Sequence, residues 1–221
     1  MGVIFEIFNK NTSKILYYTH QGLGDLISCS PIVNKIGQLF PEKKIYFIVQ
    51  NSKFKKIIQK MIKSKNVKFY IPKDWAEGKK VDDYGSHLNY FRKLSKDENY
   101  SLVFSGGEYY FSDSKIPWDF AFYNNVGLDY KIKYESFYLK RSYEKEDKSF
   151  LKITNGEPYI FIHDDPTRNR IIQIKNEKNL KIVKNDMNYS IFDFIKIVQN
   201  AEESHMMGSS LLCLIDFFKL D

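Results

Sequence analysis

The feature that most constrains the fold of this chain is an alternation of strand and helix patterns between residues 14 and 49. A β-prone run, Lys14 to Thr19, leads into a loop with two glycines, and an apolar helical pattern follows. Pro41 marks the end of that helix, and a second β-prone run covers Ile45 to Val49. This order predicts a βαβ unit with two parallel strands. The loop after the first strand then lies at the carboxyl edge of the sheet, where α/β proteins bind ligands.

The loop itself, QGLGD at residues 21–25, argues against two familiar phosphate sites. A dinucleotide fingerprint needs a third glycine and an acid ending the second strand, but here Ile27 and Gln50 stand at those places. An NTPase loop needs Gly-Lys-Ser/Thr, whereas Asp25 follows Gly24 and would repel phosphate. The loop instead places a carboxylate at the sheet edge, where it is suited to accepting a proton from a bound hydroxyl group.

A second glycine-containing loop is predicted at the same edge. A β-prone run, Tyr100 to Phe104, leads into SGGE at residues 105–108. Gly106 and Gly107 would let a substrate approach the backbone, and the alternative is an ordinary turn. The aromatic run Trp118 to Tyr123 either stacks on a sugar ring or, at helical spacing, belongs to the core.

The remaining patterns of the first half predict further strands and helices. Pro31 either kinks the helix that follows the first loop or begins it, with Ser30 as the cap. Residues 131–139 look extended, and the charged segment RSYEKEDK at 141–148 marks a boundary between two lobes. The other expectations are strands at Val3–Phe8 and Val67–Ile71, a helix at Asp82–Leu94, and core-facing side chains at Leu26, Ile27, Val33, Ile36 and Leu39.

The second half is predicted to begin with a strand at Tyr159 to His163. Ser190 and Asp193 have the spacing of a capping box for a helix that ends near Asn200. The turn at residues 208–210 leads from a short strand into the last helix. The β-prone runs are Ile171–Ile174, Leu180–Val183 and Ser204–Met207, and the last helix covers Leu211–Phe218.

Two segments of this chain are similar to segments of a known enzyme family. The first is HQGLGDLISCSPIV at residues 20–33, with FPEKKIYFIV at residues 40–49, and the second is NAEESHMMGSSLLCLID at residues 200–216. They resemble bacterial GT-B glycosyltransferases related to the lipopolysaccharide heptosyltransferases. The resemblance implies an α/β protein with two Rossmann-like lobes: an acceptor-side lobe at residues 1–140 and a donor-binding lobe at residues 141–221, shorter than the family's.

The resemblance also implies roles for residues of the first loop. In the family, the Gly-Asp of this loop opens the acceptor pocket and the aspartate is regarded as the general base, so the matching residue here is Asp25. His20 precedes the loop and is placed to orient that carboxylate. The expected acceptor-binding residues are His20, Gln21, Gly22, Gly24, Gly106 and Gly107.

The second lobe is expected to hold the diphosphate of a nucleotide sugar, whose departure leaves negative charge on oxygen. A helix N-terminus and a guanidinium group both stabilise such charge. In the family, a basic residue on the loop after the lobe's first strand contacts phosphate. Family members also carry an acid and a threonine at the terminal turn, and this chain lacks both, so how the nucleoside is held stays open. The expected donor-binding residues are His163, Arg168, Arg170, Glu203, Gly208, Ser209 and Ser210.

No metal and no resident cofactor are expected, and the nucleotide sugar is a co-substrate. The sequence contains no Cys pair, no His-x-x-x-His spacing and no two aspartates separated by a single residue. Its two cysteines, Cys29 and Cys213, fall in predicted helices and are typical of small buried hydrophobes in a reducing compartment. A metal-independent reaction follows.

Positive charge is concentrated in one stretch of the chain. The formal net charge is +7, and nine lysines with no acid lie in the Lys43 to Lys68 stretch. A basic amphipathic helix there either contacts an anionic membrane or is a solvated helix over an ordinary core. No secretory signal or membrane-spanning run is present, so a cytoplasmic location is expected, with peripheral contact at the inner face of the membrane. Its apolar positions are Phe54, Ile57, Ile58, Met61 and Ile62, and its basic ones are Lys53, Lys55, Lys56, Lys60 and Lys63.

The sequence leaves the donor sugar, the base, the acceptor and the oligomeric state open, but it predicts a class of activity. That class is a metal-independent, inverting glycosyltransferase that acts on a saccharide or lipid-linked acceptor in polysaccharide or lipopolysaccharide synthesis. Two rival classes stay open: a non-catalytic nucleotide-sugar-binding module and a basic nucleic-acid-binding protein. The second is disfavoured because no recognised RNA or DNA motif is present.

Overall fold

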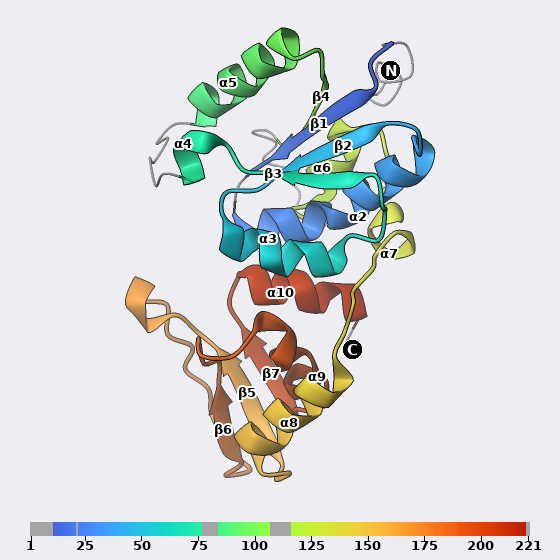
Figure 1. The fold of residues 1–221 in the computed structure, drawn as a ribbon. Helices are drawn as coiled ribbons and strands as arrows, with labels where there is room; N and C mark the ends of the chain where they lie inside the picture. The colour runs from blue at the N-terminus through green and yellow to red at the C-terminus, as the bar shows by residue number, and fades with distance from the viewer. Residues whose placement is uncertain (1–10, 21, 77–83, 107–115, 220–221) are drawn as a thin grey trace. The chain divides into compact units, whose positions relative to one another are not determined.

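The computed structural model describes residues 11–20, 22–76, 84–106 and 116–219 (Figure 1). The chain divides into two compact units, Met1–Leu139 and Lys140–Asp221, and each contains a parallel sheet. The predicted α/β class is therefore confirmed. The strand expected at Val3–Phe8 lies outside the described residues.

The sheet of the first unit has the strand order β3-β2-β1-β4. Its chain moves outward from β1 through β2 to β3, and then returns to place β4 on the other side of β1. The order thus reverses between β1 and β4, and the predicted parallel βαβ unit is confirmed. The strands are β1 (Lys14–Thr19), β2 (Lys44–Ile48), β3 (Val67–Tyr70) and β4 (Ser101–Ser105).

Helices cover both faces of this sheet (Figure 1). Side chains alternate along β1, so Leu16 and Tyr18 pack with Phe91 of α5, whereas Tyr17 lies against Cys29 of α2. Both sets are fully buried, as expected for a strand of a parallel sheet. The helices are α2 (Leu23–Leu39), α3 (Ser52–Ile58), α4 (Lys73–Ala76), α5 (Tyr84–Asp97), α6 (Phe120–Asn125) and α7 (Ile132–Glu135), and a 3-10 turn, η1 (Gln59–Met61), continues α3.

Helix α2 keeps a proline in its interior. Pro31 has no N–H to give to the carbonyl of Ile27 four residues earlier. The hydroxyl of Ser30 donates to that carbonyl at 2.8 Å instead, so Ser30 is not the cap. Four predicted core residues of the helix are fully buried, but the prediction for Leu39 is wrong, because this last helical residue is 39% exposed.

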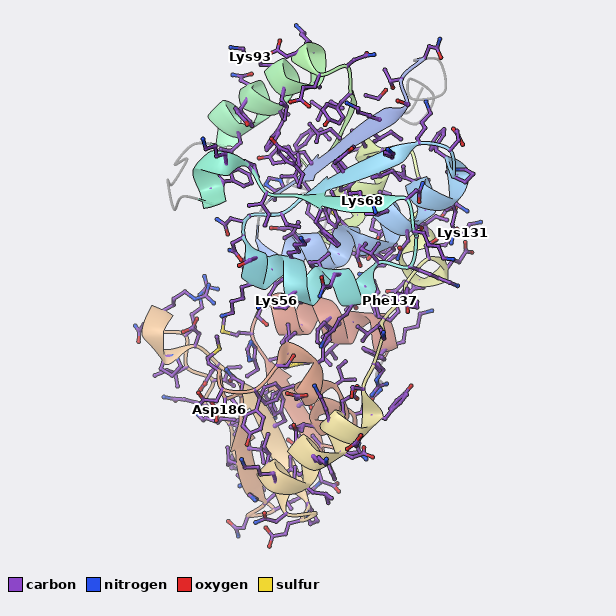
Figure 2. All side chains as sticks on the ribbon, in the orientation of Figure 1. Lys56, Lys68, Lys93, Lys131, Phe137 and Asp186 are labelled. Atoms are coloured by element: carbon purple, nitrogen blue, oxygen red, sulfur yellow. The ribbon has the colours of Figure 1, made fainter. Side chains whose placement is uncertain are left out.

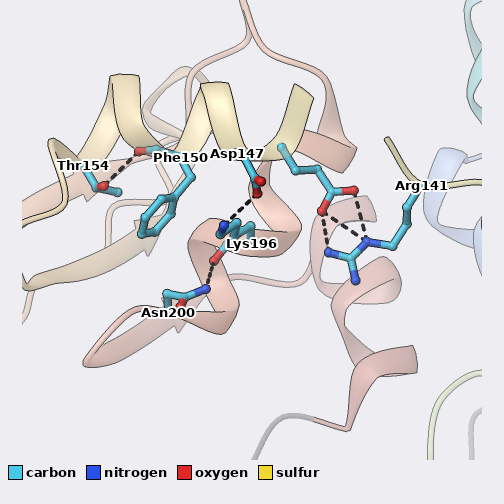
Figure 3. Close-up of polar contacts among 7 residues, drawn as sticks. Arg141, Asp147, Phe150, Thr154, Lys196 and Asn200 are labelled. Atoms are coloured by element: carbon cyan, nitrogen blue, oxygen red, sulfur yellow. Dashed lines mark hydrogen bonds and ion pairs between the residues drawn. The ribbon is translucent and has the colours of Figure 1, made fainter. Parts of the chain in front are cut away.

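One prediction near the boundary between the units is wrong. Residues 131–139 are not extended: α7 covers Ile132–Glu135, and its Lys133 is buried against Asp119. The charged segment at 141–148, where the lobe boundary was predicted, follows directly on the division between Leu139 and Lys140 and enters helix α8 (Tyr143–Thr154). Two charged side chains of this segment pair with each other: Arg141 Nε donates to both carboxylate oxygens of Glu146, at 3.0 and 3.1 Å (Figure 3).

The second unit has the strand order β6-β5-β7, so its order reverses between β5 and β7. The ion pair between Lys196 of α9 and Asp147 of α8 joins two of its helices (Figure 3). The predicted capping box at Ser190 is confirmed, and it begins the 3-10 turn before α9. The elements are β5 (Tyr159–His163), η2 (Pro166–Arg168), β6 (Lys181–Lys184), η3 (Ile191–Asp193), α9 (Phe194–Gln199), β7 (Glu203–Met206), α10 (Ser210–Ile215) and η4 (Asp216–Phe218).

The predicted strand at Ile171–Ile174 is wrong, since these residues have no regular structure. Asp165 and Arg170 close a tight turn just before them, and the place beside β5 is taken by β6. No helix in the described part of the chain is long and apolar enough to cross a membrane.

Candidate functional site

The two predicted loops of the first unit lie side by side at the reversal of strand order. Strands β1 and β4 are parallel and end in register at Thr19 and Ser105, so His20 and Gly106 follow at one edge. Ligands of open α/β sheets bind outside the carboxyl ends of the strands at such a reversal. The predicted common edge is confirmed. Gln21 and Gly107 lie outside the described residues.

Asp25 belongs to the first turn of α2 and not to a loop, and Gly24 also lies in the helix. The Asp25 carboxylate accepts bonds from the backbone N–H groups of Gly22 and of Asp25 itself, and His20 acts on it electrostatically. Burial nevertheless dominates and raises the pKa of Asp25 above its usual value, while those contacts oppose the shift. A carboxylate with a raised pKa at a ligand-binding edge is suited to general-base chemistry.

Glycine at position 22 leaves room for that carboxylate. A Cβ added to Gly22 would lie 2.5 Å from Asp25 Oδ2, so the carboxylate would have to move from its present position. Gly22 has the extended backbone conformation of an N-cap, which other residues can also adopt. What glycine contributes at this position is therefore the absence of a side chain. The missing side chain at position 22 therefore leaves the space that the Asp25 carboxylate occupies.

His20 is half-buried between the two loops. Its ring centroid is 5.9 Å from that of Phe122, and a Cβ added to Gly106 would lie 2.8 Å from His20 Cδ2. Gly106 also has a φ of +149°, which disfavours side chains, and its carbonyl accepts a bond from Asn125 Nδ2 at 2.7 Å. The second loop thus holds His20 beside Asp25.

Replacing Gly106 by alanine is expected to destabilise the first unit by about 1–3 kcal/mol, from backbone strain and from the clash with His20. Both tryptophans, Trp75 and Trp118, lie in this unit, so urea unfolding followed by tryptophan fluorescence measures the effect. In a His20→Ala background the same substitution should lower the free energy of unfolding by less, because the ring that the new Cβ would clash with is absent. An equal cost in both backgrounds would show that His20 does not pack on Gly106.

A buried polar layer supports this edge, and the sequence did not reveal it. Cys29 Sγ lies 3.4 Å from Thr19 Oγ1 and 3.8 Å from Ser105 Oγ, and the Ser105 hydroxyl donates to the Phe122 carbonyl at 2.9 Å. Burial raises the pKa of the Cys29 thiol to about 12, so it stays protonated and is not a nucleophile. Cys29 is fully buried, as predicted, and it lies beneath the site as a structural residue. Cys213 is only half-buried.

The predicted aromatic run contributes to both core and surface. Phe122 and Tyr123 are buried, whereas Trp118 is 55% exposed and contacts Phe122 edge to face at 5.5 Å. The next residue, Asp119, is buried in an ion pair with Lys133, so the backbone beside Trp118 is anchored. Phe122 contacts both His20 and Trp118, and this places an exposed aromatic ring near the Asp25 edge.

In the second unit, the strand order reverses between β5 and β7, which end in register at His163 and Met206. The Met207 N–H donates to the His163 carbonyl at 3.0 Å. The loop after β5, which carries Arg168 and Arg170, therefore starts beside the turn that begins at Gly208. The structure brings these predicted donor residues to one edge, but it does not bring Glu203 there.

Glu203 is the first residue of β7, and its pairing with Ile160 is the first in the register of β5 with β7. It is three residues, or about 10 Å, from the carboxyl end of the strand. Its carboxylate lies 3.3 Å from His205 Nε2, two residues along the same face. Parallel sheets bind ligands at the carboxyl ends of their strands. A residue just before a strand, such as Glu203 in the sequence prediction, lies at the opposite end.

The remaining donor-side residues have defined contacts. The Arg168 guanidinium pairs with Asp165 at 2.5 Å and is 58% exposed, and Arg170 is exposed. Ser209 is the N-cap of α10, and its hydroxyl accepts a bond from the Leu212 N–H at 3.2 Å. That hydroxyl is therefore already engaged with the helix, while Ser210 is the first helical residue.

His163 ends β5 with a half-buried ring. Burial lowers the pKa of His163 below its usual value, and Asn185, Asp164 and Asp165 oppose the shift. Its Nδ1 is buried without a hydrogen-bond partner in the described part of the chain. The neighbouring Asp164 is 3% exposed and pairs with Lys184 at 2.8 Å. A neutral imidazole between these charges is a candidate hydrogen-bonding group for a ligand.

A metal site was not predicted. Within residues 11–20, 22–76, 84–106 and 116–219, no three His, Cys, Asp or Glu side chains are grouped to hold an ion.

Comparison with known proteins gives a fold-level similarity. No family model matches the chain, and no curated protein matches it. Among solved structures, it is similar to the crystal structure of the glycosyl transferase family 9 from Veillonella parvula DSM 2008, with a TM-score of 0.52 and 8% sequence identity. The match covers 94% of this chain and 79% of that chain. At this identity the likeness establishes a shared fold.

Proposed function

We propose that this chain is a glycosyltransferase that moves a sugar from a nucleotide sugar to a hydroxyl group of an acceptor. The observation that carries the proposal is Asp25, a carboxylate with a raised pKa at the reversal point of the first sheet. The fold similarity to a glycosyl transferase family 9 structure supports the same class. In the proposal, the first unit binds a saccharide or lipid-linked acceptor and the second unit binds the donor.

Asp25 acts as the general base in the proposed reaction. It removes the proton of the acceptor hydroxyl group while the oxygen attacks the anomeric carbon, and the configuration at that carbon inverts. His20 orients the carboxylate, and Gly22 leaves the space that it occupies. The exposed ring of Trp118 offers a surface on which the apolar face of a sugar can stack.

The second unit stabilises the leaving nucleotide. The bond between the anomeric carbon and a phosphate oxygen of the donor breaks, and its electron pair stays on that oxygen. Arg168 or Arg170 provides the positive charge that stabilises the resulting negative charge. Arg168 must share or leave Asp165 to do so. Because α10 is short and Ser209 caps it, the arginines carry more of this role than the helix end. The reaction proceeds without a divalent metal ion in this proposal.

A thermal-shift screen with UDP, GDP, ADP and CMP and their sugars tests the donor. A ligand at 100 times its Kd should stabilise the protein by about 2.7 kcal/mol, which raises the Tm by several degrees. We expect one nucleotide family to do so, and its sugar conjugate to do so at least as well. If no nucleotide or nucleotide sugar changes the Tm, the proposed donor site is absent.

A second measurement separates an enzyme from a binding module. With the donor identified, transfer to saccharide acceptors, or slow hydrolysis of the donor, is expected with and without EDTA. Binding with neither transfer nor hydrolysis would favour a non-catalytic nucleotide-sugar-binding module. Loss of activity in EDTA would contradict the metal-independent mechanism.

A further inference from the structure

Two buried polar atoms at the edge of the second sheet have no hydrogen-bond partner. They are His163 Nδ1 and Asn185 Oδ1, and among the described residues of the second unit no other buried side-chain nitrogen or oxygen is left without one. Such an atom is unfavourable, and native proteins contain few of them. Two of them at one place therefore indicate a position where a ligand forms hydrogen bonds.

The two side chains are neighbours because of the register of β5 and β6. Ile162 pairs with Lys184, so His163 and Asn185 come next at the carboxyl ends of the two strands, where parallel sheets bind ligands. The Asn185 N–H donates to the Ile162 carbonyl at 3.3 Å, which continues the ladder by one residue. Asn185 opposes the lowering of the His163 pKa, so the side chains lie close together, yet neither unpartnered atom bonds the other. Asp186, labelled in Figure 2, is the next residue of the loop after β6.

The pair is uncharged, and the acids that follow His163 already have cationic partners. Burial lowers the pKa of His163, so its ring is neutral at neutral pH. Asp164 lies 2.8 Å from Lys184, and Asp165 pairs with Arg168. The two unpartnered atoms therefore suit an uncharged group better than an ion.

The chemistry of the two atoms narrows the kind of ligand further. Asn185 Oδ1 only accepts hydrogen bonds, so its partner must donate one, whereas Nδ1 of a neutral imidazole donates or accepts according to its tautomer. An ionised phosphate oxygen only accepts and cannot bond to Asn185 Oδ1. An edge that carries an N–H or O–H group beside a second polar atom satisfies both side chains. In a nucleotide sugar, such edges belong to the base and to the sugar, and not to the diphosphate.

We propose that His163 and Asn185 together bind an uncharged hydrogen-bonding edge of the nucleotide sugar, supplied by its base or by its sugar. This inference rests on the proposed function, because it takes the ligand of the second unit to be a nucleotide sugar. It assigns His163 to an uncharged part of the donor and leaves the diphosphate to Arg168 and Arg170. Asn185 then determines which donor is bound.

The substitution Asn185→Leu tests the inference, because leucine has nearly the same size and no polar side-chain atom. With the nucleotide sugar found in the thermal-shift screen, titration calorimetry should show binding weaker by about 10- to 100-fold, because a donor group of the ligand loses its acceptor. Without ligand, the variant should melt at the temperature of the parent or higher, because a buried unpartnered atom is gone. His163→Phe removes the other atom and should weaken binding in the same way.

Asn176 provides the matched control. It is also a half-buried asparagine of the second unit, but its amide donates to the Leu180 carbonyl at 2.7 Å and accepts from the Leu180 N–H at 2.9 Å. Asn176→Leu should therefore lower the melting temperature and leave the affinity for the nucleotide sugar unchanged. The two asparagine variants are thus expected to have opposite effects on stability and on binding.

Titrations with the nucleotide alone identify the part of the donor that is bound. An equal loss for the nucleotide and for its sugar conjugate assigns the pair to the base, and a loss confined to the conjugate assigns it to the sugar. The inference is overturned if Asn185→Leu binds both ligands like the parent, or if its melting temperature falls as in Asn176→Leu. The proposed function would then still stand, whereas a parent protein that binds no nucleotide or nucleotide sugar would overturn both.

Discussion

Replacing Asp25 by asparagine is expected to reduce sugar transfer by about 10²–10⁴-fold, the usual contribution of a general base. Asparagine has nearly the same shape, and its carbonyl oxygen can still accept the N–H bonds that the carboxylate accepts at the start of α2. It cannot remove a proton. Donor binding should be unchanged, because the residues proposed to bind the donor lie in the other unit. Steady-state transfer and a donor thermal shift measure the two quantities separately.

The raised pKa of Asp25 gives this prediction a pH dependence. The base works only when ionised, so kcat/KM should fall on the acidic side at a pH above the usual carboxyl value. The folded chain holds this proton more tightly than the unfolded chain. The contribution of Asp25 to stability is therefore lost as the pH rises from its unfolded pKa through its folded pKa. At neutral pH the Asp25→Asn variant should be as stable as the parent or more stable.

An exposed acid in the same unit provides the control. The Asp129 side chain is 62% exposed, and Asp129→Asn should retain activity. If Asp25→Asn transfers sugar at the parent rate while binding donor normally, Asp25 is not the base. A large loss of stability in Asp25→Asn at neutral pH would contradict the assignment of its pKa shift to burial.

Replacing Lys133 by methionine is expected to destabilise the first unit by about 3–5 kcal/mol, because it leaves a buried charge without its partner. The Lys133 ammonium lies 2.8 Å from Asp119 Oδ2, and the two side chains are 3% and 1% exposed. The Tyr130 hydroxyl donates to the other Asp119 oxygen at 2.7 Å. This cluster joins α7 to the start of α6 next to Trp118. Urea unfolding followed by tryptophan fluorescence measures the change.

Two further variants test the cause of that effect. Lys131→Met removes a lysine whose side chain is 64% exposed, and its effect should stay within about 0.5 kcal/mol. Adding Asp119→Asn to Lys133→Met should restore part of the lost stability, because a neutral amide replaces the unpaired carboxylate. A small effect of Lys133→Met alone would show that the ion pair is not buried.

The local patterns of the sequence were enough to define several elements. The predicted bounds of β1 and β5 are those of the structure, and the capping box at Ser190 is present. These features depend on neighbouring residues: apolar runs that can be buried on both faces, and side chains that bond the backbone three residues away. The alternation of strand and helix also placed His20 and Gly106 at one edge of the first sheet, because parallel strands end together.

Other features were decided by contacts between distant residues. Residues 131–139 are partly helical, and Lys133 of that helix is buried in an ion pair with Asp119, which no local sequence pattern predicts. Ile171–Ile174 had the composition of a strand, but β6 occupies the position beside β5.

By itself, the sequence determined the parallel α/β class and the carboxylate at the first edge, since periodicity and glycine spacing are local. Only the tertiary structure decided that this carboxylate belongs to a helix, that Gly22 and Gly106 leave room for Asp25 and His20, and that Glu203 lies at the wrong end of its strand. Those outcomes depend on register, space and burial, which are properties of the packed chain.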